Sequence, residues 1–284
     1  SLGERFDTHH SDTEALLRGY HRLGDELRHR LDGMFAAVWW DRRTARLIAR
    51  RDAAGEKPLY HHRHGPIEAY CSLPISRIDL PWVTRPTPTR RWLTHGFAPS
   101  LGDGSEPRNG ERQTEPGEWG TSGRVARTPR GGLDGDGEAP PLSAEDVDAM
   151  IARSVASRLD ADVPIGCFLS GGIDSSLVAF HAQQILSRRG QRLRTFCLRM
   201  PGDAFDESPV AAEVAELLGT DHATIDVDPK PAEDLVRLIG QLGLPLGDSS
   251  LLPTHWISKA AREHVTVALA GDGGQHAILG RLVR

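Results

Sequence analysis

The sequence has few cysteines, no long apolar run and no excess of positive charge, and each of these absences excludes a class of protein. Its 284 residues contain three cysteines, none in a C-x-x-C spacing, so we predict reduced thiols rather than a disulfide framework or a zinc site. No run of about 18 apolar residues is present, and no basic-then-apolar segment opens the chain, so the sequence predicts neither a membrane span nor a secretory signal. The formal net charge of −5 argues against a nucleic-acid-binding surface. We therefore expect a cytoplasmic protein without nucleic acid or membrane partners.

The first part of the chain predicts a helix followed by a β-hairpin. Ser11 is placed to cap a helix, with Glu14 three residues further on. The apolar run 34–40 and the segment 45–48 lie on either side of a short polar stretch, which predicts a hairpin whose first strand is buried. The first hundred residues are thus expected to be mainly sheet with one helix.

Three histidines lie close together in a second expected hairpin. The strand-like segments 59–60 and 67–71 flank them, and Gly65 follows them directly. His61, His62 and His64 have the residue type of a metal site, but we interpret them as a solvated hairpin tip, since Gly65 marks a turn.

A segment rich in glycine and proline separates two halves of different character. Between Pro99 and Pro141 there are ten glycines and six prolines in 43 residues, with few apolar side chains and no period. This composition predicts a linker or a long irregular loop.

Beyond this segment, strand-like and helical stretches alternate. Ser143 is expected to cap a helix that runs to about Leu159 with apolar residues along one side. Such alternation implies a parallel sheet with helices on both faces. The expected strands are 163–169, 193–198, 223–227 and 265–269, and the expected helices that separate them are 175–188, 208–218, 232–242 and 252–263.

The strongest local feature is a glycine-rich loop between an apolar strand and a helix. The loop reads Ser170-Gly171-Gly172-Ile173-Asp174-Ser175-Ser176, and its three serines are expected to add hydroxyl donors. Glycines allow backbone N–H groups to approach an anion, and the helix dipole favours negative charge at that point. The carboxylate of Asp174 would repel a phosphate in direct contact, so we expect it to bind a Mg²⁺ ion that lies between the carboxylate and the phosphate. The alternative is a tight turn without a ligand, but open α/β sheets bind ligands at the carboxyl ends of their strands, which favours the phosphate site.

This loop and the blocks after it resemble a known family. The loop is similar to that of the N-type ATP pyrophosphatases, which split ATP between its α and β phosphates. Within that group the order of blocks resembles class B, glutamine-hydrolysing asparagine synthetases. The matching blocks are Phe205-Asp206-Glu207-Ser208-Pro209, Leu218-Gly219-Thr220, Asp221-His222, Gly247-Asp248-Ser249-Ser250, Pro253-Thr254 and 261–274.

The N-terminal part resembles the glutaminase domain of the same family, which has an N-terminal-nucleophile (Ntn) hydrolase fold. The blocks that carry this likeness are Ser11-Asp12-Thr13-Glu14, 31–36, and Arg51-Asp52 through Lys57-Pro58-Leu59-Tyr60. We therefore expect an α/β protein with a partial glutaminase-like sheet domain at 1–98, a linker at 99–141, and a partial ATP-pyrophosphatase domain with a doubly wound parallel sheet at 142–284.

The resemblance implies a reaction and a set of ligands. Family members activate aspartate as β-aspartyl-AMP with ATP and Mg²⁺, and ammonia released from glutamine then displaces AMP. Carried over position by position, the nucleotide site comprises Phe168, Ser170, Gly171, Gly172, Asp174, Ser175, Ser176, Leu198, Ala270 and Gly271. Asp174 would bind Mg²⁺, Asp272 would assist adenylate formation, and Asp12 would bind the glutamine amino group. A carboxylate beside a helix cap, stabilised by the helix dipole, is the alternative role of Asp12.

The sequence also departs from the family pattern. Residue 1 is Ser, whereas the family's glutaminase needs an N-terminal Cys as nucleophile. Gln275 stands where the family has a second acidic Mg²⁺ ligand, and Leu244-Pro245 stands where many members have Glu-Pro. From these departures we expect an incomplete copy without glutaminase activity and with impaired adenylation.

Two alternatives to an asparagine synthetase-type ligase stay open from the sequence. One is a relative that adenylates a different carboxylate, as β-lactam synthetases do. The other is a non-catalytic remnant that binds nucleotide weakly. Because the residues that select the acyl substrate in this family lie mostly beyond Arg284, the sequence does not choose between these readings.

Overall fold

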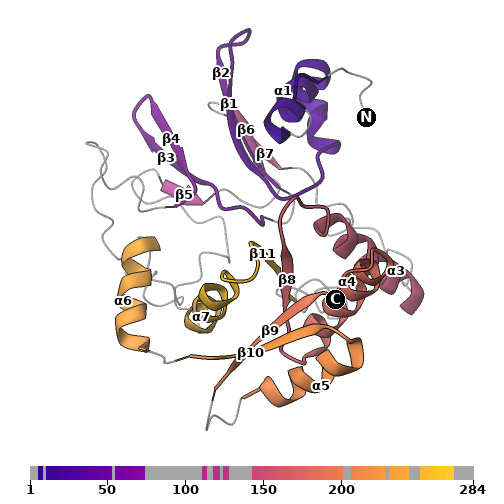
Figure 1. Ribbon diagram of the computed structural model, residues 1–284. Helices are drawn as coiled ribbons and strands as arrows, with labels where there is room; N and C mark the ends of the chain where they lie inside the picture. Colours follow the sequence, from indigo (N-terminus) through magenta and orange to yellow (C-terminus); the bar gives the residue numbers. More distant parts are fainter. Residues whose placement is uncertain are drawn as a thin grey trace. The chain divides into compact units, whose positions relative to one another are not determined.

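The computed structural model describes residues 6–8, 11–52, 55–73, 111–113, 118–121, 124–127, 143–200, 206–227, 230–242 and 250–271. The chain divides into two units, which are described separately (Figure 1). The first comprises Ser1–Ala139 with Gly240–Pro245, and the second comprises Pro140–Ile239 with Leu246–Arg284. Within the described part, none of the helices combines the length and apolar composition that a membrane crossing requires.

The described residues of the first unit form one α-helix, a 3₁₀ helix and two antiparallel sheets. The strand order is β1-β2-β6-β7 in one sheet and β4-β3-β5 in the other. As predicted, Ser11 caps the helix, since its hydroxyl accepts a hydrogen bond from the backbone N–H of Glu14. The elements are α1 (Asp12–Leu23), η1 (Gly24–His29), β1 (Ala36–Asp41), β2 (Arg46–Arg51), β3 (Tyr60–His64), β4 (Ile67–Cys71), β5 (Glu111–Gln113), β6 (Glu118–Thr121) and β7 (Arg124–Arg127).

The first hairpin forms where it was expected, but its first strand is not the buried one. β1 is at one edge of its sheet, and its residues 38–41 alternate between exposed and buried positions. Trp39 lies on the buried face and packs edge-on against Tyr20 of α1, with ring centroids 5.2 Å apart. Trp40 points the other way and is 56% exposed. Because β2 has partners on both sides, Ile48 and its neighbours are the buried residues of this hairpin.

The prediction that the histidine-rich stretch is a solvated tip is wrong. The stretch forms β3, which pairs with β4 on one side and β5 on the other. The turn lies one step later, at Gly65, whose φ of +57° suits glycine. His62 is buried, and the ring of His61 stacks on Tyr70 with centroids 4.7 Å apart. These histidines are therefore part of a sheet, and they do not belong to a metal cluster among the described residues.

The structure also differs from the sequence-based expectation of an irregular linker. The strands β5, β6 and β7 all lie within the glycine- and proline-rich segment. β5 pairs with β3, and β6 pairs with β2, so long-range pairing gives these short segments their structure. No local periodicity signals strands of three or four residues, which is why the sequence did not reveal them.

The second unit has the predicted alternating α/β architecture. Its four strands are all parallel, in the order β10-β9-β8-β11. The predicted cap on its first helix is confirmed, because Ser143 and Asp146 form a reciprocal capping box. The elements are α3 (Ala144–Arg158), β8 (Ile165–Phe168), α4 (Ile173–Arg188), β9 (Arg194–Arg199), α5 (Ser208–Leu218), β10 (Asp221–Asp226), α6 (Pro231–Leu242), α7 (Leu251–Ala261) and β11 (Val267–Leu269).

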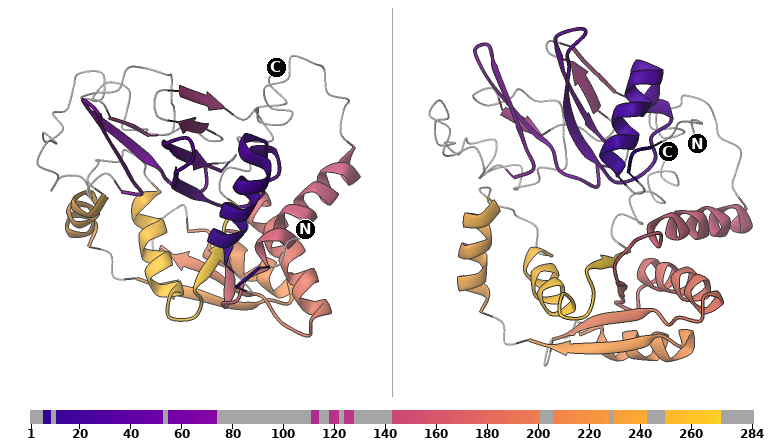
Figure 2. Two further views of the ribbon diagram at one scale, coloured as in Figure 1. Left: turned by 90° about the horizontal axis from the view of Figure 1, so that it is seen from above. Right: turned by 45° about the horizontal axis from the view of Figure 1, so that its top comes forward.

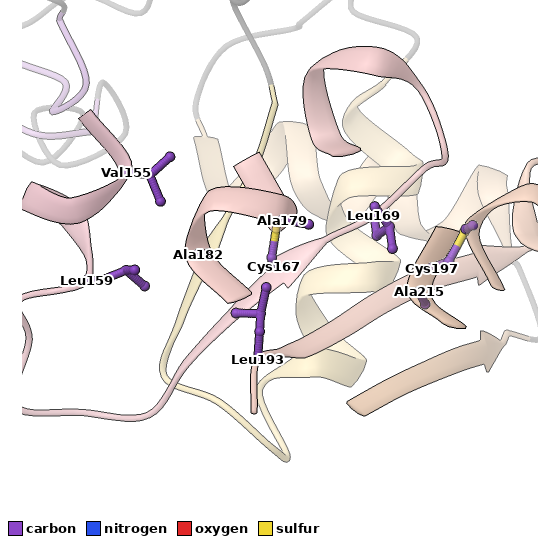
Figure 3. Packing of buried hydrophobic residues seen from close by; sticks show 10 residues of the cluster. Val155, Leu159, Cys167, Leu169, Ala179, Ala182, Leu193, Cys197 and Ala215 are labelled. Carbon is purple, nitrogen blue, oxygen red and sulfur yellow. The ribbon is translucent and has the colours of Figure 1, made fainter. Parts of the chain in front are cut away.

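Helices cover both faces of this parallel sheet. On one face, α3 and α4 run side by side (Figure 2), and residues of α3, α4 and α5 pack on Cys167, Leu169 and Cys197 (Figure 3). On the other face, Phe196 packs with Ala261 at the end of α7. The doubly wound fold expected from the sequence is thereby confirmed.

The two buried cysteines are unreactive thiols. Cys167 and Cys197 are free and buried. Burial raises the pKa of Cys167 to about 12, and burial together with the nearby acidic Glu207 and Asp206 raises the pKa of Cys197 to about 11. Both therefore stay protonated at neutral pH and contribute to packing of the core.

Candidate functional site: a phosphate loop at the carboxyl edge of the sheet

The glycine-rich loop joins the end of β8 to the start of α4. The backbone N–H of Leu169 still bonds to the carbonyl of Phe196 in β9, at 2.9 Å, so the loop leaves a fixed strand end. Gly171 then adopts a φ of +79°, and Gly172 is the N-cap of α4 without a side chain to fill that role. The first-turn N–H groups of α4 lack intrahelical partners, so they are available to an anion.

Internal hydrogen bonds hold the loop in shape. The hydroxyl of Ser175 donates to the carbonyl of Gly172, at 3.1 Å, and accepts from the backbone N–H of Ser170, at 3.2 Å. Since its one proton is used, the 2.8 Å contact between the two hydroxyls has Ser170 as donor. Neither hydroxyl keeps a proton for a ligand in this arrangement, in contrast to the expected donor role of Ser170 and Ser175.

Ser176 carries the third hydroxyl of the loop, and its hydrogen bonding differs from that of Ser170 and Ser175. Its Oγ atom is buried and has no hydrogen-bond partner among the described residues. Its backbone N–H is already bonded to the carbonyl of Gly172, at 3.0 Å. An unpaired buried hydroxyl is costly, and Ser176 is the serine of this loop whose hydroxyl proton the described contacts leave uncommitted.

The segment after β11 packs directly on the first turn of α4. A Cβ atom on Gly271 would lie 2.7 Å from the backbone N of Ser175 and 2.9 Å from the carbonyl carbon of Asp174. Only glycine permits such an approach between two backbones. The two segments that the sequence pointed to, 170–176 and 270–271, therefore meet at one place.

The start of α5 supports the loop from another direction. A Cβ atom on Gly171 would lie 2.8 Å from Cγ1 of Val210 and 3.1 Å from the backbone N of Ala211. Sequence reasoning did not assign a role to this contact. The sequence feature that could have indicated it is Ser208-Pro209, because proline favours the first turn of a helix and so marks where α5 begins.

The other expected nucleotide contacts lie at the same edge of the sheet. Phe168 and Leu198 are half-buried near the carboxyl ends of the neighbouring strands β8 and β9. Ala270 follows β11, whose last residue pairs with Cys167 of β8. The structure thus places every expected nucleotide residue at the carboxyl ends of three adjacent strands, where open α/β sheets bind ligands.

Asp174 is the one carboxylate of the loop and lies half-buried in the first turn of α4. Mg²⁺ commonly binds through one or two carboxylates together with substrate phosphates, so a single Asp beside a phosphate loop is a suitable donor set. Among the described residues, no group of three or more Asp, Glu, His or Cys side chains is placed to bind a metal ion without a further ligand. Asp272 and Gln275 lie outside the described residues.

Asp12 belongs to the first unit. It is the first residue of α1 and is exposed, beside the Ser11 cap. This position is compatible both with binding an ammonium group and with a favourable interaction with the helix dipole.

A glycine-rich loop at the carboxyl end of a parallel strand, in contact with two neighbouring segments, is the arrangement expected of a PP-loop ATP-pyrophosphatase fold. The sequence profile of the Asparagine synthase family matches residues 146–283, and that of the Glutamine amidotransferase domain matches residues 1–74. The chain thus carries matches to both domain families, and over most of its length it is similar to glutamine-hydrolysing asparagine synthetases.

Curated relatives carry both parts in the same order. The chain is 31% identical over 278 residues to a Mycobacterium tuberculosis protein provisionally named a glutamine-hydrolysing asparagine synthetase, covering 92% of this chain and 42% of the relative. It is 29% identical to asparagine synthetase 1 (glutamine-hydrolysing) of Bacillus subtilis, covering 95% of this chain and 43% of the relative. The chain thus spans about two fifths of the length of these relatives.

Solved structures give a weaker likeness. An NH₃-dependent NAD synthetase from Campylobacter jejuni matches with 14% identity and a TM-score of 0.33, over 49% of this chain and 61% of that one. An NAD⁺ synthetase from Burkholderia pseudomallei matches with 25% identity and a TM-score of 0.32, over 47% and 55%.

Proposed function

We propose that this chain carries the ATP-binding part of a ligase that activates aspartate as β-aspartyl-AMP and amidates it with ammonia from glutamine. The observation that supports this most is the backbone contact of Gly271 with Asp174 and Ser175, which brings the two expected nucleotide segments together at one place. The names of the relatives in Mycobacterium tuberculosis and Bacillus subtilis support the choice of reaction.

The chemistry requires a site that holds phosphate while a carboxylate attacks. A carboxylate is a poor acyl donor to ammonia, and attack on the α-phosphate of ATP converts it into an acyl adenylate with AMP as leaving group and pyrophosphate as product. In the proposed arrangement, the free N–H groups at the start of α4 and the hydroxyl of Ser176 bind the departing pyrophosphate. Ser170 and Ser175 keep the loop in shape.

We propose that Asp174 binds Mg²⁺ together with ATP phosphates. A bound Mg²⁺ would neutralise phosphate charge during adenylation. The carboxylate lies in the same turn as the free N–H groups, so its own negative charge weakens phosphate binding unless a cation lies between them. This placement predicts that ATP binding depends on Mg²⁺ through Asp174.

In the first unit, we propose that Asp12 binds the amino group of glutamine. The exposed carboxylate at the start of α1 supports this, since an ammonium group is a suitable partner for it. We further propose that the first part extends beyond the expected limit of residue 98 to include β5, β6 and β7, which pair into its sheets, and that the second part spans 142–284. A cytoplasmic location is also proposed, which the two buried free thiols favour.

Calorimetry with ATP, in the presence and absence of Mg²⁺, tests the nucleotide site. We expect Mg²⁺ to strengthen ATP binding by about tenfold or more, equivalent to about 1.4 kcal/mol. In Asp174→Asn this strengthening should disappear, while ATP binding without Mg²⁺ should be unchanged or tighter because a negative charge is gone.

Asp162→Asn is the matched control, since Asp162 is an exposed carboxylate just before β8, at the opposite end of that strand. It should leave both affinities unchanged. If Asp174→Asn and Asp162→Asn behave alike, or if the folded protein does not bind ATP, the proposed site is refuted.

A further inference from the structure

A chain of side-chain hydrogen bonds crosses the edge of the parallel sheet, away from the phosphate loop. It joins Thr195 of β9, Thr220 before β10, and His222 and Thr224 of β10. Oγ1 of Thr195 lies 2.9 Å from Oγ1 of Thr220 and 2.9 Å from Nδ1 of His222, and Nε2 of His222 lies 3.5 Å from Oγ1 of Thr224. Thr195 is fully buried, so it has no water to replace these partners.

Counting protons along this chain favours one tautomer of the imidazole. The hydroxyl of Thr220 has an acceptor in the carbonyl of Ala215, at 3.4 Å, and donation to it leaves Thr220 to accept from Thr195. Thr195 then donates to Thr220, and in its remaining contact, with Nδ1 of His222, the ring is the donor. This pattern favours a proton on Nδ1 and leaves Nε2 to accept from Thr224.

The surroundings disfavour a charged ring. Partial burial lowers the pKa of His222 from its ordinary value of 6.5, and it is the one cause of that shift. Charged groups on the adjoining turn and strands have partners of their own: Arg192 bonds to the carbonyls of Gly219 and Thr220, and Asp221 pairs with Arg194 across the strands. Glu216 of α5 is exposed. A proton on Nε2 would thus gain no carboxylate partner from these described residues.

The same chain fixes one end of α5. The backbone N–H of Thr220 also bonds to the carbonyl of Ala215 in the last turn of α5, at 3.1 Å. The first turn of that helix is the one that packs on Gly171 of the phosphate loop. A change in the hydrogen bonds of His222 therefore affects the attachment of α5, the helix that packs on the phosphate loop.

We propose that His222 is an acid-sensitive brace: as a neutral Nδ1–H imidazole it ties β10 to β9 and to the end of α5, and its protonation weakens that attachment. The brace rests on the geometry of the second unit and does not depend on the proposed ligase activity. Its folded-state pKa lies below the unfolded value, so its stabilising effect is complete above pH 6.5 and decreases as the pH falls from there towards the folded-state pKa.

Nitrogen NMR of the full chain labelled at its 13 histidines tests the tautomer. The His222 signals are assigned as those absent from His222→Asn. At about pH 8, where free histidine is neutral, we expect a protonated Nδ1 and an unprotonated Nε2. Thr195→Ser, which keeps the hydroxyl, should preserve this state, whereas the isosteric Thr195→Val should give a mixture of tautomers. An Nε2–H tautomer in the unmodified chain would overturn the proposal.

Urea unfolding of the same proteins across pH 5 to 8, roughly spanning the histidine range, tests the acid sensitivity. In His222→Asn the side-chain amide occupies the position of Nδ1 and can donate to Thr195 without titrating. We expect the unmodified chain to lose more stability on acidification than His222→Asn does. Equal pH dependence in the two proteins would refute the brace.

Discussion

Replacing Gly271 by alanine is the sharpest test of how the two nucleotide segments meet. The added Cβ atom would lie 2.7 Å from the N of Ser175, 2.9 Å from the carbonyl carbon of Asp174 and 3.1 Å from its Cβ atom, all well inside ordinary contact distance. Two of these atoms are backbone atoms of the first turn of α4, so a change of rotamer cannot relieve the overlap. The segment after β11 must instead move away from the loop.

The expected cost follows from two opposing terms. Overpacking costs about 1–3 kcal/mol, and the loss of glycine freedom in the unfolded chain returns about 0.4–1 kcal/mol. We therefore expect a net destabilisation of about 1–2 kcal/mol in urea unfolding. Calorimetry should show Mg²⁺·ATP binding weakened by about tenfold, since the backbone at the site has shifted.

Gly240→Ala provides the matched control. Gly240 lies in α6, and its added Cβ atom would have no neighbour within 4 Å, so alanine should stabilise the helix by about 0.5–1 kcal/mol and leave ATP binding unchanged. If Gly271→Ala is as stable as the unmodified chain and binds ATP equally well, the close contact between the two segments is not required and the reasoning fails.

Two further predictions concern polar contacts elsewhere. Hydrogen bonds from the side chain of Thr8 and the backbone of Asp7 and Thr8, together with Arg18, lower the pKa of Glu14 from 4.5 to about 2. The stability that its carboxylate provides is therefore complete above pH 4.5 and is lost as the pH falls towards 2. Urea unfolding over that range should show a steeper loss for the unmodified chain than for Glu14→Gln, and parallel curves would contradict the assignment. Trp256→Phe removes the indole N–H that donates to Asp234 at 2.7 Å, linking α7 to α6, and should cost about 1.5–3 kcal/mol of unfolding free energy. Asp234→Asn, which keeps an acceptor, should cost less, and a Trp256→Phe variant of unchanged stability would show that the bond contributes nothing.

The second unit could be predicted well because its local signals agree with its fold. α5 runs from Ser208 to Leu218, as expected, since Pro209 suits its first turn and Gly219 ends it with a φ of +70°. The capping box at Ser143 and the alternation of apolar strands with helices likewise predicted the parallel sheet. In these segments, short-range sequence patterns and tertiary structure favour the same result.

The first unit was harder to predict because its sheets depend on distant pairing. β6 pairs with β2, some 70 residues earlier in the chain, and a three- or four-residue strand has no recognisable period. The histidines of β3 are strand residues because β4 and β5 pair with them on both sides. Composition alone favoured a loop in both places.

The residues of the candidate site could be predicted from the sequence, but the role of each serine hydroxyl could not. The sequence identified Ser170, Ser175 and Ser176 as hydroxyl donors, but only the hydrogen bonds separate Ser176 from the other two. The close approach of Gly271 to α4 likewise requires coordinates, because no sequence pattern reports a backbone contact between segments about 100 residues apart.

The account's central claim is that the segments after β8 and β11 form one phosphate site. The most direct measurement is a titration of the ¹⁵N-labelled chain with Mg²⁺ and pyrophosphate, following the backbone amide signals. The account predicts that Gly171, Gly172, Ser176 and Gly271 shift together with a single affinity, and that the amides at the amino end of β8 do not. Shifts confined to one of the two segments, or no shift at either, would contradict it.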